Sequence, residues 1–405
     1  MRGEQDLIRT LRTAADRVER LDLVAGVAAR RRVRRTRQRM RVLLAAAAVV
    51  AVAGGTTAAL SGENQRAQPA VTPSAPRYTS AAALWPNAVA KVPARTAEGW
   101  KIHPVTALSA TEVLMLAPAQ ALGQPSRLEV YDMARKTTRV LGQVPGIKKM
   151  TAPAGLAVGS RYFAWYGPRF GKPTHFWIMP RSGGTAVHVA QTTANVDSVG
   201  LTEDSLVWSL QDSGGVYRVP LTGGAPSRLT GSDGLHLIAW PWAAGYDSDA
   251  PTRNHNRIVN LETRQSFDVR VPKKARLTQC TSQWCTGELK GRMFVQRADG
   301  AGRKILPAEL KPYSPRLLVG DRYALAWLGE DRAPLDVLYD MSTGAMAGLG
   351  ERLPGTQVTP VTDGLLTSAP STTLFWNQDA PPRESGKSPW DAKEWTVLNL
   401  LAVRR

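Results

Sequence analysis

The chain has 405 residues, 43% of them hydrophobic, and carries 52 Lys and Arg against 33 Asp and Glu, a net charge of +19. This apolar fraction excludes an intrinsically disordered or collagen-like chain, and the presence of only two cysteines excludes a small disulfide scaffold. The length allows two or three structural units with at least one large core. Such a basic charge makes nucleic acid and anionic membranes the first partners to consider.

Residues 1–41 predict a basic cytoplasmic tail that contains one amphipathic helix. Apolar side chains recur there every three or four positions and form a single stripe: Leu7, Leu11, Ala14, Val18 and Leu21. A helix of this length is marginal in water on its own. We therefore expect the stripe to contact a cytoplasmic protein, a second copy of the chain or the membrane surface. A helix that lies on the membrane with no specific partner is the alternative.

Residues 42–60 predict a transmembrane segment, because they carry no charge and nearly match the ~20 apolar residues that cross a bilayer as a helix. A run of arginines precedes the segment directly: Arg30, Arg31, Arg32, Arg34, Arg35, Arg37, Arg39 and Arg41. Basic residues mark the cytoplasmic end of a span, so we expect a signal anchor with its N-terminus in the cytoplasm. A cleaved signal peptide and a buried soluble helix are the alternatives, although the preceding 41 residues are long for a signal peptide.

The arginine run accounts for much of the charge without a nucleic acid. Residues 1–60 hold +8 of the net +19, and the remaining +11 is spread over 345 residues without a run. Membrane topology and attraction to anionic lipid are sufficient reasons for arginines at this place, so no nucleic-acid partner is predicted.

Residues 61–80 are polar and rich in Ala, Pro and Ser, which is typical of a linker.

From residue 81 onward the sequence predicts an all-β fold built from repeats. A strand–turn–strand unit recurs seven times, and alignment on its turn gives one column: Asp132, Met179, Val219, Asn260, Gln296, Asp340 and Asn399. A period near 40–45 residues with about four strands indicates a β-propeller. We therefore expect residues 81–405 to form an extracytoplasmic propeller. Seven blades are favoured, and the long last step of the repeat leaves six or eight open.

A second repeated unit, a tight turn that enters an apolar strand, comes before several of these hairpins. Its copies are VGSRYFAW (158–165), LTEDSLVW (201–208), SDGLHLIAW (232–240), VGDRYALAW (319–327) and VTDGLLTS (361–368), and four of the five end in Trp. Because blades stack face to face, we predict that these tryptophans pack between blades and do not bind a cofactor. We also expect a strand near 81–120 to pair with the last blade, since a sheet edge would otherwise stay unpaired.

The repeat resembles that of TolB-like propellers, as LTEDSLVW followed by VYRVPLTGGAPSRLT (216–230) illustrates. With the basic tail, the apolar segment, LWPNAVAKVP (84–93) and the CTSQWC segment, the arrangement is similar to actinobacterial membrane-anchored TolB-like proteins. The resemblance covers about 320 residues, and its motifs are common to many propellers. It implies an extracytoplasmic interaction or binding scaffold and transfers no catalytic residue.

Cys280 and Cys285 are predicted to form a structural disulfide. Two positions that face each other across a short hairpin can meet disulfide geometry, and the compartment outside the membrane is oxidising. The spacing is not that of a redox-active C-x-x-C pair, and there is no further cysteine to bind a metal.

The other chemistry-bearing residues predict no catalytic, cofactor or metal site. The histidines (His103, His175, His188, His236 and His255) lack ligand spacing and are predicted at surfaces or turns, although convergence in three dimensions stays open. The polar segment 246–257 contains oxygen ligands suited to Ca²⁺ but has no EF-hand spacing, so a solvated loop is favoured.

The function predicted from these features is a non-enzymatic, membrane-anchored scaffold whose propeller face binds a protein or another ligand of the cell envelope. One alternative is a transmembrane signalling protein whose N-terminal stripe docks a cytoplasmic regulator, such as a sigma factor. Another is an extracytoplasmic hydrolase or lyase with its site in the central channel.

Overall fold

The computed structural model describes residues 78–119, 125–145, 154–167, 173–247, 254–312, 318–328, 335–350, 367–378 and 392–403. All of them belong to one compact unit, Pro73–Arg405. The predicted stripe helix, the arginine run and the apolar segment 42–60 lie outside these residues. Within the ranges that are described, the chain has no helix long and apolar enough to cross a bilayer.

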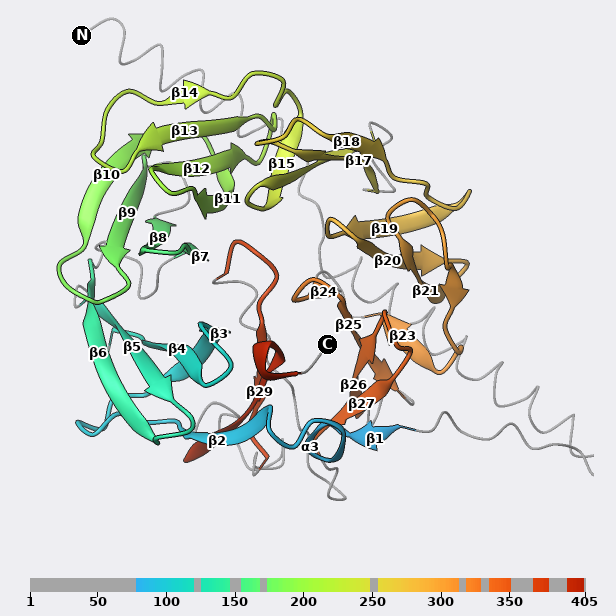
Figure 1. Ribbon diagram of the computed structural model, residues 1–405, viewed down its shortest axis with the longest axis horizontal. Coiled ribbons are helices and arrows are strands. Elements are labelled where there is room, and N and C mark those ends of the chain that lie inside the picture. The colour runs from blue at the N-terminus through green and yellow to red at the C-terminus, as the bar shows by residue number, and fades with distance from the viewer. Residues whose placement is uncertain are drawn as a thin grey trace, which may run out of the picture. The chain divides into compact units, whose positions relative to one another are not determined.

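Seven sheets follow one another along this unit and form the seven blades of a β-propeller, as the repeat predicted (Figure 1). Blades 1 to 4 have four strands each. Blade 1 contains β3 (His103–Ala107), β4 (Glu112–Ala117), β5 (Ser126–Asp132) and β6 (Thr137–Val144), and blade 2 contains β7 (Ala154–Val158), β8 (Tyr162–Gly167), β9 (Thr174–Pro180) and β10 (Val187–Thr192). Blade 3 contains β11 (Val196–Leu201), β12 (Ser205–Leu210), β13 (Val216–Pro220) and β14 (Ser227–Arg228). Blade 4 contains β15 (Leu235–Ala239), β16 (Trp242–Tyr246), β17 (His255–Asn260) and β18 (Ser266–Asp268).

Blades 5 to 7 complete the ring. Blade 5 contains β19 (Ala275–Cys280), β20 (Trp284–Leu289), β21 (Arg292–Arg297) and β22 (Lys304–Ile305). Blade 6 contains β23 (Leu310–Pro312), β24 (Leu318–Val319), β25 (Tyr323–Leu328), β26 (Leu335–Asp340) and β27 (Met346–Leu349), and β1 (Thr79–Ser80) pairs with β27 in parallel. Blade 7 contains β28 (Thr373–Trp376), β29 (Glu394–Asn399) and β2 (Val89–Pro93). Two short helices, α3 (Ala81–Leu84) and the 3₁₀ helix η2 (Leu400–Ala402), lie beside these blades.

In blades 1, 2 and 3 the second strand is a mostly apolar run, because neighbouring blades cover both of its faces. β4 reads EVLMLA and is buried from its second residue on, and β12 reads SLVWSL and is buried over its first five residues. The fourth strand is the opposite case, since both residues of β14 and of β22 are exposed. In these blades burial therefore falls from the second strand to the outer edge, so periodicity predicts the inner strands far better than the outer ones.

The N-terminal strand β2 closes the ring. It pairs antiparallel with β29 over five residues, with Val92 opposite Trp395, and thereby supplies the outer strand of the last blade. Both of these side chains are buried in the core between blade 7 and blade 1. The expectation that a strand between 81 and 120 pairs with the last blade is confirmed.

Residues Thr367–Thr372, which we call the strap, connect distant parts of the ring before β28 begins. Thr367 forms a parallel bridge with Leu156 of blade 2, and the Val199 amide of blade 3 donates to Ser368 Oγ (3.0 Å). At the other end of the strap, Thr372 Oγ1 lies 2.9 Å from Thr106 Oγ1 of blade 1. The repeat unit at 361–368 was predicted to enter an apolar strand. Residues 361–366 of this unit lie outside the described residues, and its described end, Thr367 and Ser368, contacts blades 2 and 3.

The tryptophans of the second repeat unit follow the prediction in part. Trp165 and Trp208 are almost completely buried in the cores between blades 1 and 2 and between blades 2 and 3. The Trp208 ring lies 4.6 Å from Phe176 of the neighbouring blade. Trp240 is only partly buried, because it lies in the turn after β15, the first strand of blade 4, where its Nε1 donates to Glu262 (3.0 Å). It still packs against the core between blades 3 and 4.

Candidate ligand-binding site

A cavity of about 610 Å³ lies where four neighbouring blades and the strap meet. The turn between the first two strands of a blade and the end of its third strand lie at the same end of an antiparallel sheet. These segments of blades 4 to 7 supply the wall: Ile238, Ala239, Trp242, Thr281, Ser282, Gly320, Asp321, Arg322, Tyr323, Leu400, Leu401 and Val403, with Ala369, Pro370 and Thr372 from the strap. Most of the wall is apolar, and a few polar groups interrupt it.

Arg322 provides the positive charge in this wall. Its Nη2 donates to Asp340 Oδ2 (3.0 Å), and its guanidinium lies over the Tyr323 ring, 4.9 Å from the centroid. The Asp340 carboxylate is buried, and its Oδ1 accepts from the amide and the hydroxyl of Ser342 (2.9 and 2.7 Å). Burial raises the pKa of Tyr323. This wall therefore offers a fixed, charge-paired guanidinium beside a neutral phenol.

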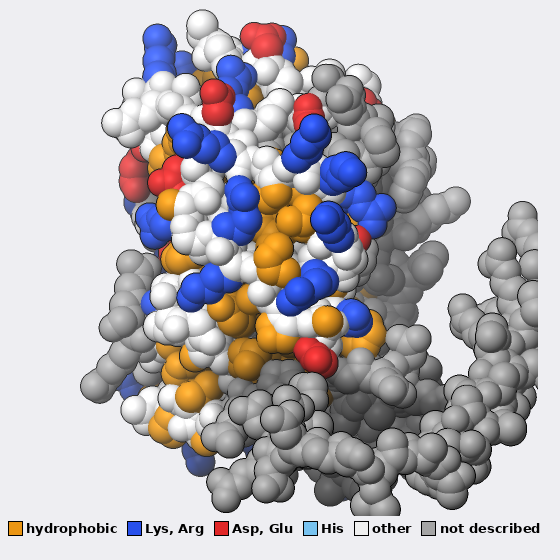
Figure 2. Space-filling model, turned by 90° about the vertical axis from the view of Figure 1, so that its right-hand side faces the viewer, with side chains coloured by type: hydrophobic (Ala, Val, Ile, Leu, Met, Phe, Trp, Pro, Cys, Tyr) orange, Lys and Arg blue, Asp and Glu red, His pale blue; other side chains and the backbone are white. Residues whose placement is uncertain are grey.

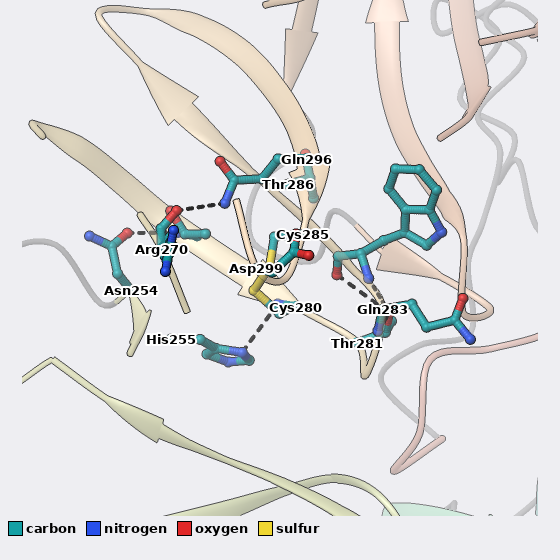
Figure 3. The surroundings of a disulfide bond; sticks show 12 residues. Asn254, His255, Arg270, Cys280, Thr281, Gln283, Cys285, Thr286, Gln296 and Asp299 are labelled. Atoms are coloured by element: carbon teal, nitrogen blue, oxygen red, sulfur yellow. Dashed lines mark hydrogen bonds between the residues drawn. A yellow bond between two sulfur atoms is a disulfide. The ribbon is translucent and has the colours of Figure 1, made fainter. Parts of the chain in front are cut away.

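Thr281 joins blade 5 to blade 6 at the cavity. Its Oγ1 donates to the Asp321 carbonyl (2.9 Å) and accepts from the Trp284 amide (3.1 Å). The Cys280–Cys285 disulfide closes the same turn, across paired positions of β19 and β20 whose Cα atoms are 4.0 Å apart (Figure 3). The disulfide thus holds the hairpin that carries this part of the wall.

The end of blade 7 contributes the largest exposed apolar group of the wall. Asn399 Oδ1 accepts from the Leu401 amide (2.9 Å) and starts η2, while Asn399 Nδ2 donates to the Ser109 carbonyl of blade 1 (2.8 Å). Leu401 follows with 48% of its surface exposed, whereas Leu400 is buried. Asn399, a residue of the predicted turn column, therefore positions the Leu401 side chain in the cavity wall.

A second polar cluster lies between blades 3 and 4. His236 Nδ1 is 2.5 Å from Asp197 Oδ2, and the hydroxyl of Ser209 donates to the other oxygen of this carboxylate. The Tyr246 ring lies 5.0 Å from His236 and 4.9 Å from His255. Asp197 accepts from both the hydroxyl and the imidazole, so the serine is not activated by the histidine as it is in a Ser-His-Asp triad.

His255 is buried, and the structure corrects its expected place at a surface or turn. Burial first, and then the charge of His236, lower the pKa of His255 to about 4. Its Nδ1 accepts from the Cys280 amide (3.1 Å), which requires the neutral ring (Figure 3). The preceding Asn254 is also buried and bonds the Ala275 carbonyl and the Thr278 amide. Asn254 and His255 of segment 246–257 therefore contact blade 5, whereas residues 248–253 of the predicted loop lie outside the described residues.

Of the remaining three histidines, two lie beside each other and the third stacks on a phenylalanine. His175 Nδ1 lies 3.1 Å from His188 Nε2 on adjacent strands of blade 2, and the His103 ring stacks on Phe375. Burial lowers the pKa of His188, and the charge of His175 adds to this effect. No three His, Cys, Asp or Glu side chains in the described ranges are placed to hold a metal ion together.

The sequence reasoning missed the cavity residues. A signal for Arg322 does exist, because VGSRYFAW and VGDRYALAW place Arg161 and Arg322 at the same position. In blade 2 the column residue is Met179, and Arg161 Nη2 donates to the Glu203 carbonyl of the next blade. In blade 6 the residue of the turn column is Asp340, so Arg322 has a carboxylate partner in its own blade.

Comparison with known proteins shows similarity in fold. No protein-family model matches the sequence, and no curated protein sequence does. TolB from Acinetobacter baumannii is 10% identical over 59% of this chain and 66% of its own length, with a TM-score of 0.38. Oligogalacturonate lyase from Vibrio parahaemolyticus is 8% identical over 76% of this chain and 96% of its own, with a TM-score of 0.44. A prolyl endopeptidase is 12% identical over 68% of this chain and 46% of its own, with a TM-score of 0.45.

These similar structures include both enzymes and a protein, TolB, that is not named as one. At such low identities the similarity concerns the propeller fold alone. Many unrelated functions use the same fold, so the function has to be argued from the site.

Proposed function

We propose that this chain is a membrane-anchored, extracytoplasmic propeller that binds a ligand in the cavity between blades 4 and 7 and does not transform it. The cavity is the observation that carries the proposal. Its volume of about 610 Å³ falls within the range of small-molecule sites, and its mostly apolar wall with a few fixed polar groups is typical of them.

The chemistry of the wall favours binding over catalysis. Asp321 is the single carboxylate among the described lining residues, and none of those residues is a histidine. Arg322 is charge-paired, and the hydroxyl of Thr281 is occupied by two backbone partners. The His236–Asp197 pair comes from other positions of blades 3 and 4 and is not part of the lining. Among the described lining residues, Asp321 has neither a second carboxylate nor a histidine with which to share acid–base work, and the wall favours a mostly apolar ligand with one polar end.

The anchoring part of the proposal rests on the sequence of residues 30–60. Eight arginines followed by an uncharged apolar segment favour a single span with the N-terminus inside, which places the propeller outside. The partner is then a small molecule of the envelope or an apolar side chain of an envelope protein.

Binding of 8-anilinonaphthalene-1-sulfonate, an apolar fluorophore with one anionic group, tests the cavity. We expect one saturable site, and we expect Leu401→Asp to weaken it at least tenfold because the new carboxylate adds charge to an apolar wall. Val140→Asp is the matched control, since Val140 is equally exposed, at 52%, but lies on β6 of blade 1. Equal affinities in the two variants, or the absence of a saturable site in the unchanged protein, would contradict the proposal.

A further inference from the structure

Blade 5 concentrates the positive charge of the propeller. Residues 270–304 contain nine basic and two acidic side chains, so they hold +7 of the +11 found beyond residue 60. The nine, which we call the blade 5 basic surface, are all exposed: Arg270, Lys273, Lys274, Arg276, Lys290, Arg292, Arg297, Arg303 and Lys304. The positive charge beyond residue 60 is therefore not evenly spread along the chain, because a single blade holds most of it.

The strand register places these residues at both ends of blade 5, with Lys274, Lys290 and Arg292 at one end and Arg270, Arg297 and Arg303 at the other. Ala275 pairs with Leu289 and Arg276 with Glu288, so the adjacent Lys274 and Lys290 lie at the same end of β19 and β20. At the outer strands, Gln296 Nε2 and Arg303 Nη2 both donate to the Arg270 carbonyl. Figure 2 faces the side of the molecule that holds β19–β21 and shows many more Lys and Arg than Asp and Glu side chains around an apolar strip.

Little of this charge is neutralised within the propeller. In the described part of the chain, Arg276 is the only one of the nine with an ion-pair partner, Glu288 (2.7 Å). Arg292 and Arg303 make hydrogen bonds to backbone or amide oxygens, and Arg297 covers the Trp284 ring. The surface thus keeps a field that attracts an extended anionic partner.

Exposed apolar side chains lie among these basic residues. Leu277 and Ile305 are 40% and 42% exposed. Leu277 has a φ of +53° in the bulge that interrupts the pairing between β19 and β20, a backbone conformation that is costly for a leucine. Basic residues that alternate with exposed apolar ones are suited to the interface of an anionic bilayer, where the charges meet headgroups and the apolar groups enter the boundary region.

We propose that the blade 5 basic surface docks on the anionic phospholipid surface of the membrane that anchors the chain. This inference rests on the proposed membrane anchor, which would keep the propeller close to a bilayer. Residues 61–77 can span no more than about 60 Å even when fully extended, so the docking surface stays within reach of the headgroups. A weak electrostatic contact is then sufficient, because the tether gives it a high effective concentration.

Lysine footprinting tests this docking. The full chain is placed in vesicles of phosphatidylcholine alone or of phosphatidylcholine with phosphatidylglycerol, acetylated briefly and digested for mass spectrometry. We expect Lys273, Lys274 and Lys290 to react at least fivefold more slowly in the anionic vesicles, and this protection to disappear at high salt. Lys136 and Lys393, which belong to other blades, serve as internal controls and are expected to react equally in both vesicles.

A triple substitution to glutamate separates docking from anchoring. Lys273→Glu, Lys274→Glu and Lys290→Glu together should abolish the protection of Lys304, the lysine of the blade 5 basic surface that remains, and the same change at Lys91, Lys136 and Lys393 should preserve it. Resistance to alkaline extraction from the vesicles reports the anchor separately. If alkali extracts the chain from the vesicles, the proposed membrane anchor is wrong. Protection of the blade 5 lysines of such a chain by added anionic vesicles would still support docking.

Two results would overturn the docking proposal. One is equal lysine reactivity in neutral and anionic vesicles. The other is protection by a duplex oligonucleotide or by heparin but not by anionic vesicles, which would assign the surface to a soluble polyanion.

Discussion

Polar side chains at the end of the third strands turn the chain, and some of them also bind another segment. Asp132, Asn260, Asp340 and Asn399 each accept backbone amides two or three residues further on. Such contacts are local, so the repeated column could be predicted from the sequence. Asp340 also binds Arg322, and Asn399 also bonds the Ser109 carbonyl of blade 1. These second partners come from other strands, and no local pattern predicts them.

Asp340→Asn should reveal how much the cavity ion pair contributes. The amide keeps an oxygen for the turn but removes the charge that faces Arg322, so we expect the free energy of unfolding to fall by about 2 kcal/mol. Denaturant titration measures this change. Asp132→Asn is the control, because its partner Arg135 is 82% exposed and that pair is screened by solvent. Equal losses in the two variants would mean that burial of the pair has no consequence.

His255 predicts a pH dependence of stability. Its pKa is about 4 in the folded protein and about 6.5 when unfolded, so the unfolded state binds more protons between these values. The stability that the neutral ring contributes is complete above pH 6.5 and is lost as the pH falls toward 4. Between pH 7 and 5.5 we expect a loss of about 1 kcal/mol in unfolding free energy from this residue. His255→Gln should remove that part of the slope, and an unchanged slope would contradict the assignment.

Among the strands, those at the centre of a blade were predictable and those at its edge were not. β4 and β12 are apolar runs because blades cover both of their faces, whereas β14 and β22 have two exposed residues each. The strap carries no periodic signal, since single bridges and hydroxyl contacts hold it in place. The disulfide hairpin had a simple signal, two cysteines across a short turn, and β19 and β20 bring these together.

Strand β2 provides a direct test of ring closure. Val92→Asn places an amide in the core opposite Trp395, and we expect a loss of more than about 2 kcal/mol in unfolding free energy. Hydrogen exchange should also become faster in β28 and β29. Lys91→Asn introduces the same residue at the exposed neighbouring position of the strand and should have little effect. Exchange in blade 7 that stays unchanged in Val92→Asn would show that β2 does not hold the ring closed.

At the scale of the whole molecule, the repeat predicted seven blades, but the cavity and the basic surface could not be predicted in the same way. The cavity combines turns of four blades with the strap, and none of these segments is distinctive by itself. The basic surface lies within one blade, where its nine residues stand singly or in pairs on three strands and the connections around them, so no charge run marks it in the sequence. The cavity arises from the ring, which brings together segments that are far apart along the chain.

Labelling of single cysteines in intact cells tests the central claim, an anchored propeller outside the membrane, most directly. The two natural cysteines are joined in a disulfide, so Val140→Cys and Gln5→Cys each add one reactive thiol to the full chain. A membrane-impermeant maleimide is predicted to label Val140→Cys in intact cells and Gln5→Cys only after lysis. Labelling of Gln5→Cys in intact cells, or of Val140→Cys only after lysis, would contradict the account.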